Sequence, residues 1–116
     1  MEEDLYCKIY IDSSCSKSEL LDHISNMVQG KVSLRTIESK TMEIDVMDND
    51  DYDKDKASQG DGFVYYPYYL EIDAVEGVNS TTYIEAISNM LKGLQNFCAK
   101  AIASCDFEDK LSVKAI

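Results

Sequence analysis

Apolar and polar residues alternate near the start of the chain, and the period then becomes helical. The apolar side of residues 5–11 carries Leu5, Cys7, Ile9 and Ile11, and this alternation predicts a half-buried strand. Residues 17–29 repeat apolar positions at helical spacing, which predicts an amphipathic helix. Ser16 and Glu19 form a capping-box signature at its start, and Gly30 is predicted to end it.

Alternation returns between residues 32 and 46. One side of this segment carries Val32, Leu34, Met42, Ile44 and Val46. Ile37 falls out of phase with the series, so we expect two strands, or one strand with a bulge, that meet near residues 38–40. The opposite side of the second part carries Thr41, Glu43 and Asp45, and it is expected to face solvent.

Residues 61–73, DGFVYYPYYLEID, contain four of the eight tyrosines of the chain. Aromatic and β-branched residues favour a pleated, half-buried surface, which predicts one long strand. Alternation then turns Tyr66 and Tyr68 toward the core, with Val64, Leu70 and Ile72. It turns Tyr65 and Tyr69 the other way, where they are the better candidates for contact with a partner. Pro67 has no N–H to give to a sheet, so we expect it at an edge, a bulge or an unpaired position.

A second helix is predicted from about residue 80, with Asn79 or Ser80 as its cap and an apolar face over residues 84–97. Residues 99–105 fit either a continuation of this helix or a last strand, and symmetry with the first half favours the strand. The order β-α-β-β-β-α-β predicts an α+β fold over residues 1–116. It is expected to be a single domain with an antiparallel or mixed sheet of about five strands and two helices on one face, close to a split β-α-β arrangement.

The formal net charge of the 116-residue chain is −11. An acidic chain lacks the positive field with which proteins hold nucleic acid or anionic membranes, and it suits a basic partner. The N-terminal residues contain no basic segment followed by an apolar run, so we expect no signal peptide, no membrane span and a cytoplasmic protein. In that reducing compartment free or buried thiols are expected at Cys7, Cys15, Cys98 and Cys105.

The acidic loop at residues 48–62 invites a calcium-site interpretation that its spacing does not support. Asp51, Asp53 and Asp55 match the first ligand positions of an EF-hand loop. The same register puts Lys56 where glycine is needed and Gly62 where a bidentate glutamate is needed. We therefore expect a solvated acidic loop and no metal.

No enzyme signature is complete in the sequence. The carboxylate pairs Glu43/Asp45 and Glu71/Asp73 are typical of the wet side of a sheet, whereas a glycosidase needs an acid of raised pKa in a carbohydrate cleft. His23 is the only histidine, and without neighbouring ligands or a nucleophile we expect it to lie at a solvated or boundary position. We expect a protein without catalytic activity and without a cofactor.

Two stretches carry a resemblance to a known class of proteins. They are the aromatic segment 61–73, with its Gly-Phe-Val-Tyr-Tyr-x-Tyr-Tyr-Leu-Glu-Ile core, and Cys-Asp-Phe-Glu-Asp-x-Leu at residues 105–111. The chain resembles the immunity proteins of bacterial polymorphic toxin systems, including contact-dependent growth inhibition, and the order of elements agrees over nearly its whole length. The resemblance implies a cytoplasmic inhibitor that binds one cognate toxin domain, often a nuclease, and blocks it.

The charge and the aromatic residues indicate where such a toxin would bind. A basic nuclease surface would be met by carboxylates, with aromatic anchors at the centre of the contact. The candidate partner-binding residues are Asp50, Asp51, Asp53, Asp55, Tyr65, Tyr69, Glu71 and Asp73. The alternative is a small-molecule-binding or regulatory α+β module, which would have a closed, ligand-sized cavity.

Overall fold

The computed structural model of this chain describes residues 4–60, 62–97 and 100–111. The sequence predicts Asp61 and Ala99 in strands and Cys98 as a free or buried thiol, and these three residues lie outside the described residues. The helices and strands are β1 (Cys7–Asp12), α1 (Lys17–Val28), β2 (Lys31–Ser33), β3 (Thr36–Glu38), β4 (Met42–Asp48), α2 (Lys54–Ala57), β5 (Tyr68–Ala74), α3 (Ser80–Phe97) and β6 (Lys100–Cys105).

The strands form one antiparallel sheet in the order β2-β3-β4-β5-β1-β6. β1 and β4 both pair antiparallel with β5, so they run parallel to each other with β5 between them. β5 and β6 likewise run parallel with β1 between them. The chain therefore makes two interlocked split β-α-β units, one through α1 and one through α3, and this confirms the predicted α+β class. The sheet has six strands rather than about five because the segment after α1 folds into a hairpin.

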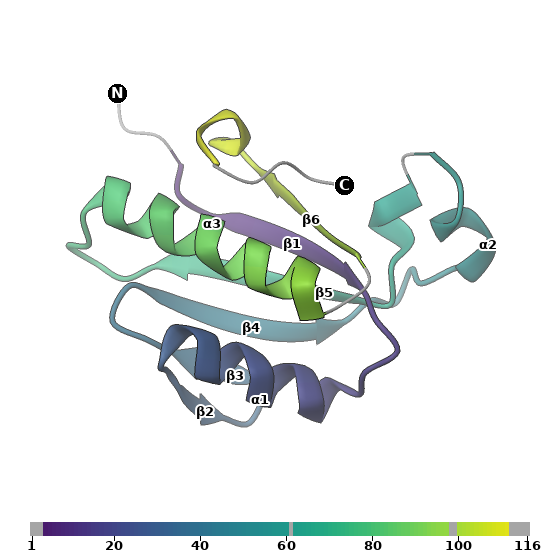
Figure 1. The fold of residues 1–116 in the computed structure, drawn as a ribbon, viewed down its shortest axis with the longest axis horizontal. Coiled ribbons are helices and arrows are strands. Elements are labelled where there is room, and N and C mark those ends of the chain that lie inside the picture. Colours follow the sequence, from purple (N-terminus) through teal and green to yellow (C-terminus); the bar gives the residue numbers. More distant parts are fainter. Residues whose placement is uncertain (1–3, 61, 98–99, 112–116) are drawn as a thin grey trace.

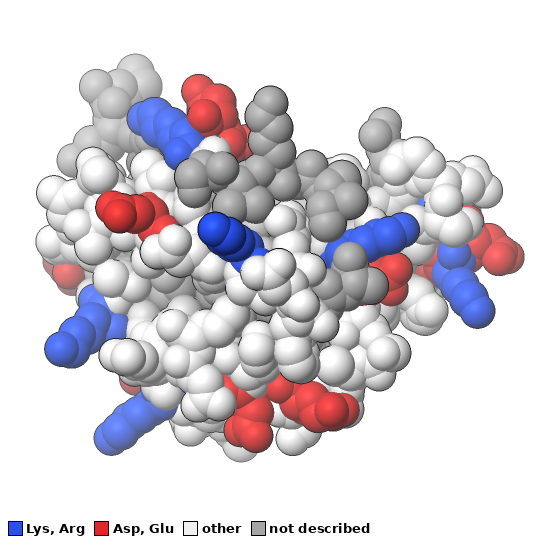
Figure 2. Space-filling view, in the orientation of Figure 1, with Lys and Arg blue, Asp and Glu red and all other residues white. Residues whose placement is uncertain are grey.

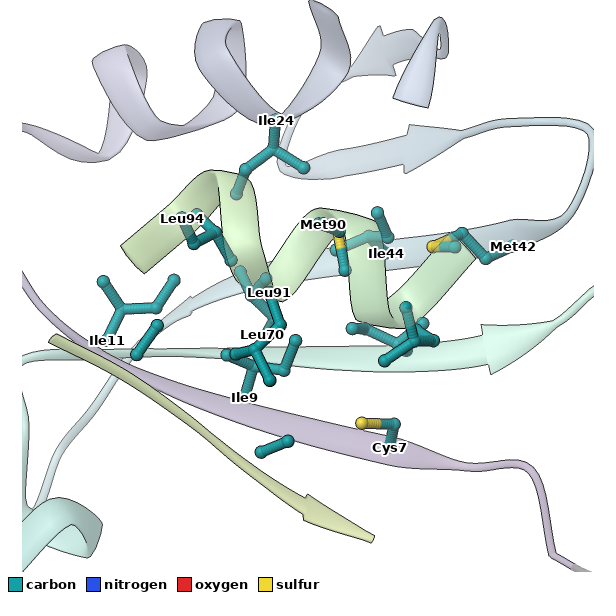
Figure 3. Close-up of a cluster of buried hydrophobic side chains, with 14 of the residues drawn as sticks. Cys7, Ile9, Ile11, Ile24, Met42, Ile44, Leu70, Met90, Leu91 and Leu94 are labelled. Atoms are coloured by element: carbon teal, nitrogen blue, oxygen red, sulfur yellow. The ribbon is translucent and has the colours of Figure 1, made fainter. Parts of the chain in front are cut away.

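Helices α1 and α3 lie side by side on one face of the sheet (Figure 1). The core fills the space between these helices and the sheet, and Figure 3 shows side chains from both layers meeting there. Ile24 of α1 and Leu91 of α3 are fully buried against strand residues such as Ile9, Ile44 and Leu70. Burying a side chain of this size stabilises the fold by about 1.5–3 kcal/mol.

The predicted capping box at the start of α1 is confirmed. Ser16 Oγ accepts from the Glu19 N–H at 3.2 Å, and Glu19 Oε1 accepts from the Ser16 N–H at 3.0 Å. The helix ends differently from the prediction, because Gln29, with φ of 53°, is the left-handed residue. Gly30 is needed for space instead: a Cβ at this position would lie 2.7 Å from Ile37 Cγ2 and 2.8 Å from the Glu38 carbonyl oxygen.

The segment between α1 and β4 departs from the predicted alternation. Val32 and Leu34 are predicted on the core side, but they are 45% and 93% exposed. β2 and β3 pair through a two-residue turn at Leu34 and Arg35, and within this hairpin Ile37 is the buried side chain. Leu34 has φ of 57°, a conformation that costs most residues about 1–2 kcal/mol. Hairpin turns usually carry glycine or asparagine at such a position, and leucine gives no such signal. The alternation therefore placed Leu34 in a strand rather than in a turn.

The aromatic segment is also divided differently from the prediction. Residues 62–65 form a short 3-10 helix, and β5 begins only at Tyr68. Pro67 lies between them at an unpaired position, as its missing N–H requires. Tyr66 is 5% exposed and Tyr68 packs half-buried against the core, whereas Val64 lies at the surface. The expected long strand is therefore wrong in its first half and correct in its second.

Part of the acidic loop is helical. Asp53 caps the single turn of α2 by accepting from the backbone N–H groups of Asp55 and Lys56 at 3.0 and 3.1 Å. The next turn, the 3-10 helix, packs against α2 so closely that Gly62 touches the Lys56 carbonyl and leaves no room for a Cβ. This segment projects beyond one end of the sheet (Figure 1).

The last third of the described chain follows the prediction except at Phe97, which the apolar pattern places on the buried face of the helix but which is 41% exposed. Asn79 caps α3, since its Oδ1 accepts from the Thr82 N–H at 3.1 Å, and residues 100–105 form strand β6. Tyr83 of α3 is fully buried and donates its hydroxyl to the Leu5 carbonyl at 2.7 Å. Its ring packs edge-on against the buried Phe107, with centroids 5.9 Å apart.

Candidate functional site

One face of the sheet is covered by α1 and α3, and the two long helices leave the opposite face uncovered. Side chains alternate along each strand, so the residues between the buried positions of β1, β4 and β5 belong to this face. They are exposed or half-buried: Lys8 and Tyr10 on β1, Glu43 and Asp45 on β4, and Tyr69, Glu71 and Asp73 on β5. We call this surface the open face.

Carboxylates lie opposite one another across the strands of the open face. Glu43 is in register with Glu38 on one side and with Asp73 on the other, and Asp45 is in register with Glu71. These residues, Glu38, Glu43, Asp45, Glu71 and Asp73, are called the acidic patch. Like charges directly opposite each other destabilise a sheet. Among the described residues the patch carboxylates form no ion pair, and the Lys17–Asp48 pair, at 3.0 Å, lies outside the patch.

Two carboxylates of the acidic patch are oriented by hydroxyl groups. Tyr6 donates its hydroxyl to Glu71 Oε2 at 2.9 Å, and Thr36 donates to Asp45 Oδ1. Burial, followed by the hydrogen bond to Glu71, raises the pKa of Tyr6 well above its usual range. The hydroxyl of Tyr6 therefore stays protonated and remains a donor to Glu71 at neutral pH.

The helix-covered side has a different distribution of charge. Figure 2 shows this side, with Lys and Arg side chains lying between those of Asp and Glu. On the open face, each row of the acidic patch ends beside a lysine: Lys31 is in register with Glu38, and Lys8 is in register with Glu71. The five carboxylates of the patch therefore outnumber the two lysines that are in register with it.

A hollow of about 300 Å³ lies at the end of the open face nearest the acidic loop. It is lined by Lys8, Tyr10, Asn49, Asp50, Asp51, Val64, Tyr65 and Tyr69, and we call it the tyrosine hollow. The rings of Tyr10 and Tyr69 have centroids 6.0 Å apart, and Phe63 packs edge-on against Tyr10 at 5.4 Å. Aromatic side chains from β1, β5 and the 3-10 helix thus meet at one place.

Asn49 holds the wall of the tyrosine hollow in position. Its side-chain amide donates to the carbonyl groups of Val64 and Tyr66 at 2.9 and 2.7 Å, and its Oδ1 accepts from the Asp51 N–H at 3.0 Å. Its backbone N–H donates to the Pro67 carbonyl at 2.9 Å. One side chain therefore joins the start of the acidic loop to the segment before β5.

The structure brings most of the predicted site residues together. Asp50, Asp51, Tyr65 and Tyr69 line the tyrosine hollow, and Glu71 and Asp73 belong to the acidic patch on the same face. Asp55 lies on α2 and Asp53 immediately before it, away from the sheet. Asp53 uses its carboxylate as the helix cap, and Asp55 is exposed in the first turn.

Several residues of this surface were missing from the sequence-based set of candidates. They are Lys8, Tyr10, Glu38, Glu43 and Asp45. The alternation of Glu43 and Asp45 was a usable signal, because it matches that of Glu71 and Asp73. Only the pairing of β4 with β5 shows that these acids share one face.

The described residues offer little material for metal or thiol chemistry. Among them, no group of three or more His, Cys, Asp or Glu side chains is placed to hold a metal ion. His23 stacks on the ring of Phe97, with centroids 3.7 Å apart. Cys7, Cys15 and Cys105 are free thiols, and the hydrogen bond to Cys105, together with burial, raises the pKa of Cys7.

In the part of the chain that the structure describes, no helix has the length and apolar character needed to cross a membrane. Comparisons with models of protein families, with curated proteins and with solved structures find no match for this chain.

Proposed function

We propose that this chain is an immunity protein that binds a basic toxin domain in the cytoplasm and neutralises it by covering its active site with the open face. The observation that carries the proposal is the acidic patch, in which carboxylates lie in register across β3, β4 and β5 and outnumber the two lysines, Lys8 and Lys31, that face its outer members. A basic partner would relieve this repulsion. The resemblance in residues 61–73 and 105–111 supports the same class of partner.

A nuclease toxin fits this surface best. Nuclease active sites gather Lys, Arg and His side chains to hold phosphate, and a patch of carboxylates can occupy such a site in place of the nucleic acid. The tyrosine hollow beside the patch supplies aromatic area of the kind that anchors protein interfaces. No catalytic role is proposed for any residue of the chain.

The test uses the toxin domain encoded next to this gene, because immunity and toxin genes are typically neighbours. The patch variant carries Glu38→Gln, Glu43→Gln and Asp73→Asn. The control variant carries Asp22→Asn, Glu76→Gln and Glu85→Gln at exposed positions on α1, in the turn before α3 and on α3. Both variants change the net charge by the same amount, so a difference between them reports on position rather than total charge.

We expect the patch variant to lose association rate by about tenfold or more at low salt, and to protect cells poorly against the toxin. The control variant should bind and protect nearly as well as the natural sequence. Equal behaviour of the two variants would remove the acidic patch from the proposal. A natural protein that neither binds nor neutralises the neighbouring toxin would overturn the function itself.

A further inference from the structure

The rings of the tyrosine hollow already hold cations. Lys8 Nζ lies 4.6 Å from the centroid of the Tyr69 ring and 5.6 Å from that of Tyr10. Lys56, which is not among the residues that line the hollow, has its Nζ 5.1 Å from the centroid of the Tyr65 ring. The negative face of an aromatic ring attracts a cation in this position. The hollow therefore presents ring faces in the arrangement that a positively charged group requires.

The shape and charge of the hollow favour a planar cation. Its volume is about 300 Å³, and Asp50 and Asp51 contribute to its lining. A guanidinium group is flat, stacks on aromatic faces and donates several N–H groups in a fixed fork that suits a carboxylate. A lysine ammonium is more strongly hydrated and cannot stack in this way. Arginine is therefore the side chain that best matches this combination of rings and acids.

The hollow is organised before any ligand arrives. The Asn49 hydrogen bonds to Val64 and Tyr66 fix one wall. The edge-on contact of Phe63 supports the Tyr10 ring on the other side. A preformed site of this kind binds without first ordering its own loops, which reduces the free energy lost on binding.

Resting on the proposed function, we propose that the tyrosine hollow binds a guanidinium group, supplied in the complex by an arginine side chain of the toxin. The incoming group displaces Lys8 from the ring faces. Lys8 lies in register with Glu71 on the neighbouring strand, so the displaced ammonium can pair with that carboxylate. Lys8 therefore competes with the incoming guanidinium for the ring faces, so replacing this lysine should strengthen guanidinium binding.

The test needs no toxin: N-acetylarginine methylamide is titrated into the protein and followed by two-dimensional NMR. We expect shifts confined to residues lining the hollow, and much weaker shifts with the citrulline analogue, which has the same shape without the charge. Lys8→Gln should tighten guanidinium binding roughly two- to fivefold, the factor that an exposed cation–π contact represents. Tyr65 lines the hollow but is not part of the sheet, so Tyr65→Leu should weaken guanidinium binding by a similar factor. Tyr52 is exposed and does not line the hollow, so Tyr52→Leu should leave guanidinium binding unchanged.

The inference would be overturned by equal binding of the citrulline analogue or by weaker guanidinium binding in Lys8→Gln. It would also be overturned if N-acetyllysine methylamide, titrated in the same way, bound more tightly than the arginine compound. Urea unfolding of each variant shows whether its fold is intact, and Tyr69→Leu provides a second ring variant if Tyr65→Leu unfolds. The guanidinium titration does not depend on the toxin-protection assay. A failure of guanidinium binding can therefore be distinguished from a failure of the proposed immunity function.

Discussion

Replacing Glu43 by glutamine should make the free protein more stable. Glu43 lies at the centre of one row of the acidic patch, directly opposite both Glu38 and Asp73. Glutamine keeps nearly the same shape and removes the charge, so the substitution eliminates two repulsive contacts. Among the described residues, no hydrogen bond or ion pair of the Glu43 carboxylate is lost in exchange.

The expected gain follows from the register. A cross-strand pair of side chains changes the free energy of unfolding by about 0.2–1 kcal/mol, and like charges act in the unfavourable direction. Both pairs of Glu43 are exposed, which places each in the lower part of that range. Two pairs together then predict a gain of about 0.4–1 kcal/mol, which corresponds to roughly 2–6 °C in Tm for a chain of this size.

Urea unfolding followed by circular dichroism, at low salt and in 1 M NaCl, measures this gain. Salt at 1 M reduces the Debye length to about 3 Å, so the advantage of Glu43→Gln should shrink at high salt. Glu85→Gln, on the exposed side of α3, is the matched control and should change the stability little. A loss of stability in Glu43→Gln, or a gain that salt does not reduce, would refute the assignment of repulsion to this row.

Four further changes test other parts of the structure. Asn49→Ala removes the hydrogen bonds to the Val64 and Tyr66 carbonyls and should cost about 2–3 kcal/mol in urea unfolding. An unchanged stability would show that these two hydrogen bonds do not stabilise the fold. Leu34→Gly relieves the positive φ and should stabilise by roughly 0.5 kcal/mol after the entropy of glycine is subtracted, and a destabilised variant would contradict the strain. Tyr66→Ala should cost about 3–5 kcal/mol of stability because the side chain is nearly fully buried. Tyr65→Ala should leave the melting temperature closer to that of the natural protein and should weaken toxin binding. A larger loss of stability in Tyr65→Ala than in Tyr66→Ala would contradict the assignment of Tyr66 to the core and Tyr65 to the binding surface. Burial raises the pKa of Tyr6 and Tyr83 above the ordinary value near 10. The neutral hydroxyls therefore contribute stability that is complete below about pH 10 and is lost as the pH rises through the higher folded-state pKa values. Ultraviolet absorbance follows the titration of the tyrosines, and a single step near pH 10 for all of them would contradict the raised pKa values.

Local sequence signals predicted much of the fold. The Ser16 and Glu19 side chains satisfy backbone N–H groups within one turn, so the start of α1 depends on neighbouring residues alone. The alternation in β1 and β4 gave the correct buried faces, because one side of each strand meets the helices. These features do not depend on which strands are neighbours.

The errors occurred where distant residues decide the local conformation. The 3-10 helix at residues 62–65 is held by Asn49 from the preceding loop, and Gly62 is required by the close approach of α2. Neither contact can be read from the aromatic pattern, which by itself favours a strand. The turn at Leu34 was missed for a related reason, since no residue there signals the left-handed conformation that the hairpin imposes.

The candidate site was partly predictable for the same reasons. Tyr69, Glu71 and Asp73 follow from alternation along one strand, and the structure places them on the open face as expected. Tyr65 reaches the tyrosine hollow from a 3-10 helix, so its predicted side was correct although the predicted strand was not. Glu38 and Glu43 join the surface only through the register of β3 with β4, which one sequence does not reveal.

The most direct test of the proposed binding surface is a cross-saturation NMR map of the complex with the neighbouring gene's toxin domain. This measurement identifies the residues of the chain that contact the partner without altering any of them. We expect the strongest effects on the open face, at residues 36–45 and 69–73 and around the tyrosine hollow, with α1 and α3 unaffected. A footprint centred on the exposed sides of α1 and α3, with the open face silent, would contradict it.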